Sequence, residues 1–311
     1  MFTPSHYGLY FMPAHVQAAQ RDQEREPLSS AWGYLYSHQP SGAEAALWGG
    51  LRYRFAAQVK PAEVGAELLA RHIDPALMNG ASLDAISETV MLAHAYEMLR
   101  DFGGFSADDQ ARWRDAFSER IERLNAPRPD LLVHESLWLG LLNLAGGIVL
   151  EREALFQQGV AAFQNAIAEE VRPQGFITRA VTQRETDQPS ATFYRQLMAS
   201  SALVLMAEAS AHVGVNLWDY AVRGVSVITT AIYPIYYFYT TEKWKWEAGL
   251  PVEDVQALFR QHGGYLEIAQ RRAQLRDLGT LLQDLRPVFD ARGGGLTTLT
   301  HATARRRGLF G

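Results

Sequence analysis

Two residues with acid–base chemistry, His134 and Tyr194, stand near the predicted starts of two helices, and Arg184 and Arg195 lie close to the tyrosine in sequence. The amino terminus of a helix is electropositive and suits an anion, which makes His134 a candidate for contact with an acidic group. A cation beside a phenol favours its ionised form, so Tyr194, with an unperturbed pKa of about 10, could serve as a base. These residue types predict a site that binds an anion and moves a proton.

Each of these residues also has a purely structural interpretation. A single histidine at a helix start is more often a cap or a core residue, and one tyrosine among 13 is more often packing. Trp244 and Trp246 are candidates for stacking on sugar rings, with core or rim packing as the equal alternative. Four further tyrosines are interpreted as a wall of the fold: Tyr233, Tyr236, Tyr237 and Tyr239.

Composition and motifs exclude several other kinds of chemistry. The chain has no cysteine, which rules out disulfides, thiolate metal sites and cysteine nucleophiles. It has no P-loop and no G-x-S-x-G, H-E-x-x-H or G-x-G-x-x-G motif, and His262-Gly263-Gly264 is interpreted as a helix end. The nine histidines are scattered along the sequence, so we expect no catalytic metal.

Charge and hydropathy argue against nucleic acid and membranes as partners. The formal net charge is −5 at pH 7, and the basic run Arg305-Arg306-Arg307 is interpreted as a solvated end. The most apolar stretch, 222–239, is interrupted by Arg223 and Pro234 and falls short of the about 20 apolar residues that span a bilayer. The first residues lack the pattern of a signal peptide, which leaves an intracellular protein and one that has lost a signal as alternatives.

Four stretches of the chain alternate small and large residues, and more charged helical segments fall between them. Small residues let helices approach closely, and helix pairs joined by short loops can close into a ring. The sequence therefore predicts an all-α fold, an (α/α) toroid or incomplete α/α barrel of helical hairpins. We expect one domain over 1–290 and, after a glycine-rich stretch, a loose tail over 291–311. The small-residue stretches are 46–55, 92–99, 137–147 and 199–207.

Helical periodicity recurs along the whole chain, with Gly, Pro, Asp or Asn between one helix and the next. One segment, 175–182, instead carries the β-branched and aromatic residues of a short strand or hairpin arm. The expected helices are 13–26, 28–38, 42–57, 61–73, 83–102, 107–124, 133–149, 152–171, 190–213, 217–232, 252–271 and 273–288.

Five short motifs follow one another in a fixed order: Leu132-Val133-His134-Glu135-Ser136-Leu137-Trp138, Gln174-Gly175-Phe176, Gln183-Arg184-Glu185, Phe193-Tyr194-Arg195-Gln196 and Gly214-Val215-Asn216-Leu217. Their order over roughly residues 10–275 resembles the alginate lyase family of helical-toroid polysaccharide lyases. That family has Asn-Asn-His-x-Tyr-Trp, an Asp-Gly-Phe-like turn, an arginine-bearing loop, Tyr-His-x-Tyr and Gly-Val-Asp-Leu. Leu132 and Val133 replace its two asparagines, and Arg195 stands in place of its second histidine.

The resemblance implies β-elimination in an acidic, uronate-containing polysaccharide or oligosaccharide, without a metal or an organic cofactor. On that mechanism His134 neutralises or orients the C5 carboxylate, and Tyr194 is both the base for the C5 proton and the acid for the leaving O4. Arg184 grips the carboxylate or lowers the pKa of the tyrosine. The residues assigned to substrate binding are Arg195, Trp138, Trp244, Trp246 and Asn79, the last as a substitute for the family's amino-terminal catalytic lysine.

Two other functions stay open at this point. A non-catalytic carbohydrate-binding or scaffold protein would keep the toroid without the asparagine-rich site. A glycoside hydrolase would need two carboxylates that face each other across the groove, and the acids near the predicted site are Glu135, Glu185 and Asp187. The polymer, the endo or exo mode and the oligomeric state are not predicted.

Overall fold

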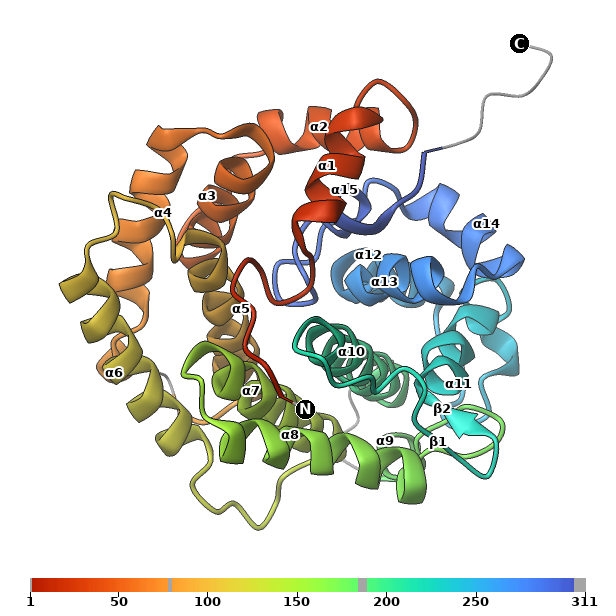
Figure 1. The fold of residues 1–311 in the computed structure, drawn as a ribbon. Helices are drawn as coiled ribbons and strands as arrows, with labels where there is room; N and C mark the ends of the chain where they lie inside the picture. Colours follow the sequence, from red (N-terminus) through yellow and green to blue (C-terminus); the bar gives the residue numbers. More distant parts are fainter. Residues whose placement is uncertain (1, 78–79, 184–188, 305–311) are drawn as a thin grey trace.

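The structure is a computed structural model that describes residues 2–77, 80–183 and 189–304. Seen from one end, its helices form a ring (Figure 1). The first half of the ring contains α1 (Pro13–Arg21), α2 (Leu28–Ser37), α3 (Ala43–Ala56), α4 (Val59–His72), α5 (Leu83–Leu99), α6 (Ala107–Leu124) and α7 (Val133–Val149). The second half contains α8 (Glu153–Asn165), α9 (Thr178–Thr182), α10 (Ala191–His212), α11 (Val227–Ile232), α12 (Val252–His262), α13 (Gly264–Ala273), α14 (Arg276–Leu285) and α15 (Thr297–His301).

The burial of the helices confirms the predicted all-α toroid with an inner and an outer layer. α5, α7 and α10 are buried around nearly their whole circumference, whereas α6 and α8 bury only one face. α3, α5, α7 and α10 pack beside one another in chain order, and α4 and α8 pack on the outside of α3 and α7. In the part of the chain that the structure describes, no helix is long and apolar enough to cross a membrane.

Small residues set the distance between the layers. A Cβ atom added at Gly147 of α7 would lie 2.4 Å from the backbone nitrogen of Phe156 in α8. One added at Gly159 of α8 would lie 2.6 Å from the carbonyl oxygen of Gly140 in α7. Both glycines are therefore required for the close approach of α7 and α8, as the pattern of small residues predicts.

Two segments differ from the predicted secondary structure around the middle of the chain. The strand expected over 175–182 is wrong, because residues 178–182 form α9 and the extended backbone is limited to one bridge between Val171 and Ile177. The Ile177 N–H donates to Gln196 Oε1 at 2.8 Å instead of to a neighbouring strand. The helix expected over 217–232 begins only at α11, after the hairpin of β1 (Ala221–Val222) and β2 (Val225–Ser226). Arg223 and Gly224 both have positive φ, which suits a two-residue hairpin turn.

Two further differences lie near the carboxyl end. The helix expected over 252–271 is broken at Gly263 into α12 and α13. The tail expected to be loose after residue 290 is packed as far as Ala302, so that prediction is wrong for its described part. Leu296, Leu299 and His301 are each exposed by 1% or less, and α15 packs against α1, α2 and α13. The glycines of 293–295 form a tight turn rather than a linker, with hydrogen bonds in both directions between the backbones of Asp290 and Gly295.

Candidate active site

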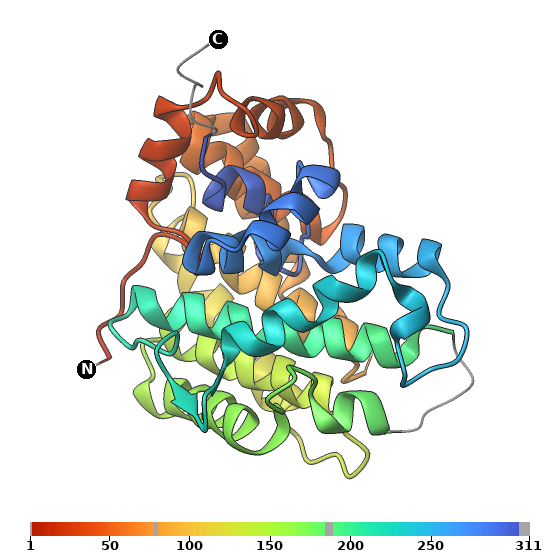
Figure 2. The ribbon, with the colours of Figure 1, turned by 90° about the vertical axis from the view of Figure 1, so that its right-hand side faces the viewer.

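A cavity of about 420 Å³ opens where the amino-terminal ends of α7 and α10 meet α12. Its volume is in the range of small-molecule sites. In the side view of Figure 2, the long helix α10 crosses the middle of the molecule. α12 packs against α10. The cavity brings together three of the predicted site residues, His134, Tyr194 and Arg195. The other lining residues are Leu132, Pro189, Ser190, Ala191, Asp254, Ala257 and Leu258.

His134 is a buried, neutral imidazole at the wall of the cavity. It is the second residue of α7 and only 4% exposed. Its Nδ1 is buried without a hydrogen-bond partner among the described residues. Burial, aided by the charge of Arg195, lowers the pKa of His134 to about 4. At neutral pH the ring therefore carries no charge and has a lone pair available to a ligand.

Tyr194 lies between two imidazoles. The centre of its ring is 6.0 Å from that of His134 and 5.5 Å from that of His262, both edge to face. Burial raises the pKa of Tyr194 to about 12; Asp84 raises it further and Arg292 opposes the shift. The expectation that neighbouring cations lower this pKa is therefore wrong, because the loss of solvent outweighs them. At neutral pH the phenol keeps its proton.

Arg195 supplies a fixed positive charge beside the histidine. The residue is 4% exposed, and its Nε–H donates to the carbonyl oxygen of Ala191 at 3.2 Å, one turn earlier in α10. It lines the same cavity as His134 and lowers the pKa of that ring. A guanidinium in this position can pair with a carboxylate of a ligand.

The start of α10 is held by acidic side chains that the sequence does not mark as part of the site. Glu247 accepts the backbone N–H groups of Ser190 and Thr192, the latter at 3.3 Å, and the Thr192 hydroxyl at 2.9 Å. Asp254 accepts the Ser190 hydroxyl at 2.7 Å. A carboxylate at a helix amino terminus satisfies backbone N–H groups that have no partner within the helix. Glu247 and Asp254 therefore fix the end of the helix that carries Tyr194.

Removing the carboxylate of Glu247 is expected to destabilise the protein, because Glu247→Ala leaves two N–H groups at the start of α10 without this partner. The expected loss in the free energy of unfolding is about 1–2 kcal/mol. Urea unfolding monitored by circular dichroism measures it. Glu242→Ala, at an exposed position in the same segment, is the matched control and should change the free energy by less than about 0.5 kcal/mol. Equal stability of the two variants would contradict the capping role.

The far side of Tyr194 is formed by residues near the carboxyl end of the chain. His262 ends α12, and the buried Asp290 accepts backbone N–H groups from Gly264 at 3.3 Å and Gly293 at 2.8 Å. Arg292 pairs with Asp84. Burial lowers the pKa of His262 and raises that of Asp290. The sequence predicts only a helix end and a linker here. It gives no signal for the contact with Tyr194, because only the closure of the ring creates that contact.

The remaining predicted site residues lie in different surroundings. Arg184 and Asn79 are outside the described residues. Trp138 is 1% exposed and donates its indole N–H to the carbonyl oxygen of Met198 at 3.0 Å, so the prediction that it contacts substrate is wrong. Trp244 is likewise buried and donates to the Thr192 hydroxyl at 2.9 Å, so it supports the start of α10 rather than stacking on a sugar.

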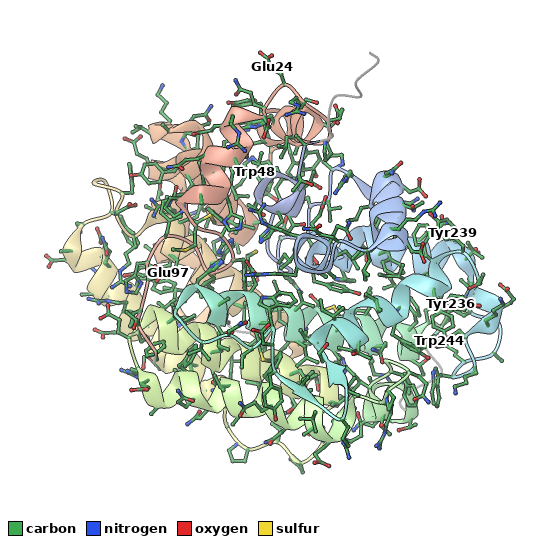
Figure 3. All side chains as sticks on the ribbon, turned by 45° about the vertical axis from the view of Figure 1, so that its right-hand side comes forward. Glu24, Trp48, Glu97, Tyr236, Tyr239 and Trp244 are labelled. Carbon is green, nitrogen blue, oxygen red and sulfur yellow. The ribbon has the colours of Figure 1, made fainter. Side chains whose placement is uncertain are left out.

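Trp244 belongs to an aromatic cluster on the side of η3 (Tyr233–Phe238), near Tyr236 and Tyr239 (Figure 3). This cluster includes Tyr237, whose ring centre is 4.8 Å from that of Trp244, which supports the interpretation of the tyrosines as a wall. Trp246 is half-buried against Phe176, with 4.8 Å between the ring centres. It does not line the cavity described above, and its role in substrate binding stays a prediction.

The acids near the cavity are used as caps. Glu135 accepts the backbone N–H of Leu132 at 3.1 Å, at the start of α7. Asp254 is engaged by Ser190, as described above. Glu185 and Asp187 lie outside the described residues. No pair of acids in the described part of the site faces across the cavity in the manner of a glycoside hydrolase.

A family model for alginate lyase matches residues 78–245, more than half of the chain. The chain belongs to the alginate lyase family. No curated protein sequence matches it.

Solved alginate lyases share the toroid. A variant of alginate lyase A1-III complexed with a tetrasaccharide has a TM-score of 0.69 at 17% identity, over 91% of this chain and 78% of its own. Alginate lyase A1-III from Sphingomonas species A1 has a TM-score of 0.68 at 16% identity, over 89% and 77%. An alginate lyase from Bacteroides ovatus has a TM-score of 0.70 at 9% identity, over 96% and 99%.

Proposed function

We propose that this alginate lyase family member cleaves an acidic, uronate-containing polysaccharide or oligosaccharide by β-elimination in the cavity between α7, α10 and α12. The observation that carries the proposal is the meeting of a neutral imidazole, a neutral phenol and a guanidinium at the amino-terminal ends of two helices. A related toroid, the A1-III variant, is described as complexed with a tetrasaccharide, which supports a saccharide as the ligand.

The charges in the cavity fit the first requirement of the reaction, a neutralised C5 carboxylate. Arg195 and the positive amino-terminal end of α7 both face the cavity in which that carboxylate would bind. Their field stabilises the negative charge that develops on the carboxylate when C5 loses its proton. Arg184, close in sequence to Gln183, is the proposed second contact. The side chain of Gln183 accepts the backbone N–H of Val133 at 3.2 Å, beside His134.

The protonation states favour a division of the proton transfers between two residues. His134, neutral above pH 4, takes the proton from C5 as the C4–C5 double bond forms. Tyr194, neutral below pH 12, gives its proton to O4 as the C4–O4 bond breaks. We propose this assignment in place of the sequence-based one, in which Tyr194 performs both steps, because a phenol that keeps its proton at neutral pH can donate it to O4 but is not available to accept the C5 proton.

The pH dependence of kcat/KM separates these two assignments. With His134 as the base, kcat/KM is expected to be level from about pH 5 to about pH 9 and to fall through about pH 4 as the imidazole gains a proton. With Tyr194 as the base, kcat/KM would rise about tenfold per pH unit across neutral pH, following the phenolate fraction. The two assignments are distinguished by measuring initial rates from pH 3 to about pH 10 with one substrate whose concentration can be raised to saturation. Circular dichroism checks that the protein stays folded at each pH.

The proposed function itself is tested with a panel of polymers. Purified protein is incubated with alginate, glucuronan and related uronate polymers, and with neutral polysaccharides as controls. We expect new ultraviolet absorbance from unsaturated uronate with at least one acidic polymer and none with the neutral ones. Binding of an acidic polymer without any such absorbance would instead favour a non-catalytic carbohydrate-binding protein.

A further inference from the structure

A second cluster of titratable side chains lies at the opposite end of α10 from the candidate active site. Glu208 and His212 stand at the carboxyl end of this helix, 14 residues and more beyond Tyr194, which corresponds to about 20 Å along the axis. His15 of α1 and His301 of α15 meet them there, with 5.2 Å between the centres of their rings. One donor atom each of His15, Glu208 and His301 lies within 4.8 Å of the others.

We propose that His15, Glu208 and His301 bind a divalent transition metal, with Zn²⁺ as the ion that suits this donor set. Two imidazoles and a carboxylate are ordinary zinc ligands, and a fourth position would be left for water. Metal–ligand distances of about 2.0–2.1 Å in a tetrahedral site place the donor atoms about 3.4 Å apart. His301 Nε2 and Glu208 Oε1 are already 3.7 Å apart. Small side-chain movements therefore suffice to form the site.

The buried side chains of the cluster are oriented for a ligand. His301 is 1% exposed, and its Nε2 has no hydrogen-bond partner among the described residues. The Nδ1 of the same ring is held by the Thr300 hydroxyl at 2.7 Å, which leaves Nε2 directed at the cluster.

Glu208 is also buried, and its two oxygens have different surroundings. Oε2 accepts hydrogen bonds from Trp218 at 3.1 Å and from Arg272 at 3.1 and 3.2 Å. Oε1 accepts from His212 at 3.1 Å and faces His301. Trp218 and Arg272 fix the carboxylate through Oε2, as the outer partners of metal ligands do, and Oε1 keeps a further lone pair for the metal beside the bond from His212.

His15 completes the site from the side of the solvent. It is half-buried, so an ion can reach the cluster past it. Its Nδ1 now accepts the backbone N–H of Met12 at 3.1 Å. Ligation through Nε2 places the ring proton on Nδ1 and ends that hydrogen bond. A metal–imidazole bond is much stronger than one neutral hydrogen bond, so the exchange favours metal binding.

The site would join parts of the chain that are far apart in sequence. α1 and α15, the first and last helices among the described residues, lie side by side in Figure 1, and Glu208 belongs to the central helix α10. A metal bound to all three would fasten both ends of the chain to the inner ring. Its role is therefore structural and independent of the proposed lyase activity. The wide sequence separation of the ligands explains why no motif predicts them.

Metal-free protein, prepared with a chelator, provides the test. Titration with Zn²⁺ in a calorimeter is expected to show one ion per chain, and thermal unfolding is expected to move to higher temperature when Zn²⁺ is present. His15→Gln changes the half-buried ligand and so leaves the core intact. It should weaken zinc binding by about tenfold or more and remove most of the thermal shift. His72→Gln, at the end of α4, is the matched control and should bind Zn²⁺ with the same affinity as the unsubstituted protein.

Two results would overturn the proposal. One is the absence of stoichiometric zinc binding by the folded, metal-free protein. The other is equal zinc affinity of His15→Gln and His72→Gln, which would place the ion elsewhere. Because His301→Gln alters a fully buried position, its zinc affinity is interpreted only if circular dichroism shows the native fold; a native His301→Gln with unchanged affinity would also contradict the site.

Discussion

Replacing Tyr194 with phenylalanine is expected to lower kcat on an acidic polysaccharide by about 10²–10⁴-fold, the usual contribution of a positioned general acid. The substitution removes only the hydroxyl group, and the aromatic ring keeps its edge-to-face contacts with His134 and His262. KM is expected to stay within about threefold, because the lost interaction belongs to the transition state. Steady-state kinetics on the best polymer of the panel measure both constants.

Tyr236→Phe is the matched control for this experiment. Tyr236 belongs to η3, is exposed (Figure 3) and accepts a hydrogen bond from Lys243 at 2.8 Å; it does not line the cavity. Removing the Tyr236 hydroxyl should leave kcat unchanged. If Tyr194→Phe retained more than about a tenth of the activity, the phenol would not be the proton donor, and the assignment of roles in the cavity would fail.

Trp138→Ala is expected to lower the free energy of unfolding by about 3–5 kcal/mol, as large-to-small changes of buried aromatic residues do. The side chain is among the largest of the fully buried ones, and its N–H is bonded to the Met198 carbonyl, which ties α7 to α10. Chemical denaturation measures the loss. Trp138→Phe keeps most of the volume and should cost about 1–3 kcal/mol, which gives a result even if the alanine variant does not fold.

The same experiment separates packing from sugar binding. Trp246→Ala, at a half-buried tryptophan, serves as the control and should cost less than Trp138→Ala. Replacing a tryptophan that binds substrate would raise KM and leave the free energy of unfolding almost unchanged. That result at Trp138 would contradict its place in the core and restore the sequence-based assignment.

The ring of helices could be predicted because its physical signals are local. Small residues such as Gly147 and Gly159 occur where two helices touch, and every inner helix repeats them. The prediction of a strand at 175–182 is wrong because the segment has the composition of a strand but, among the described residues, no neighbouring strand to pair with. The backbone N–H of Ile177 donates instead to the side chain of Gln196. The prediction of a loose tail after residue 290 is wrong because a run of glycines is typical of a linker, whereas these glycines form a turn closed by the backbone of Asp290.

The candidate site could be predicted in part for a similar reason. His134, Tyr194 and Arg195 were found at helix starts, and the toroid brings those starts to one cavity. The protonation states could not be predicted from the sequence, since burial depends on the whole ring and shifts the pKa of Tyr194 upward although Arg292 opposes the shift. His262 and Asp290 approach Tyr194 only through closure of the fold, and no spacing along the chain marks them.

Mass spectrometry of the products from a uronate oligosaccharide of defined length tests the central claim most directly. β-Elimination splits the chain without adding water, so the masses of the two products must sum to the mass of the substrate, and one product must carry the C4–C5 double bond. We predict this result for the unchanged protein and its near-absence for Tyr194→Phe. Products whose summed mass exceeds that of the substrate by one water would show hydrolysis and contradict the account.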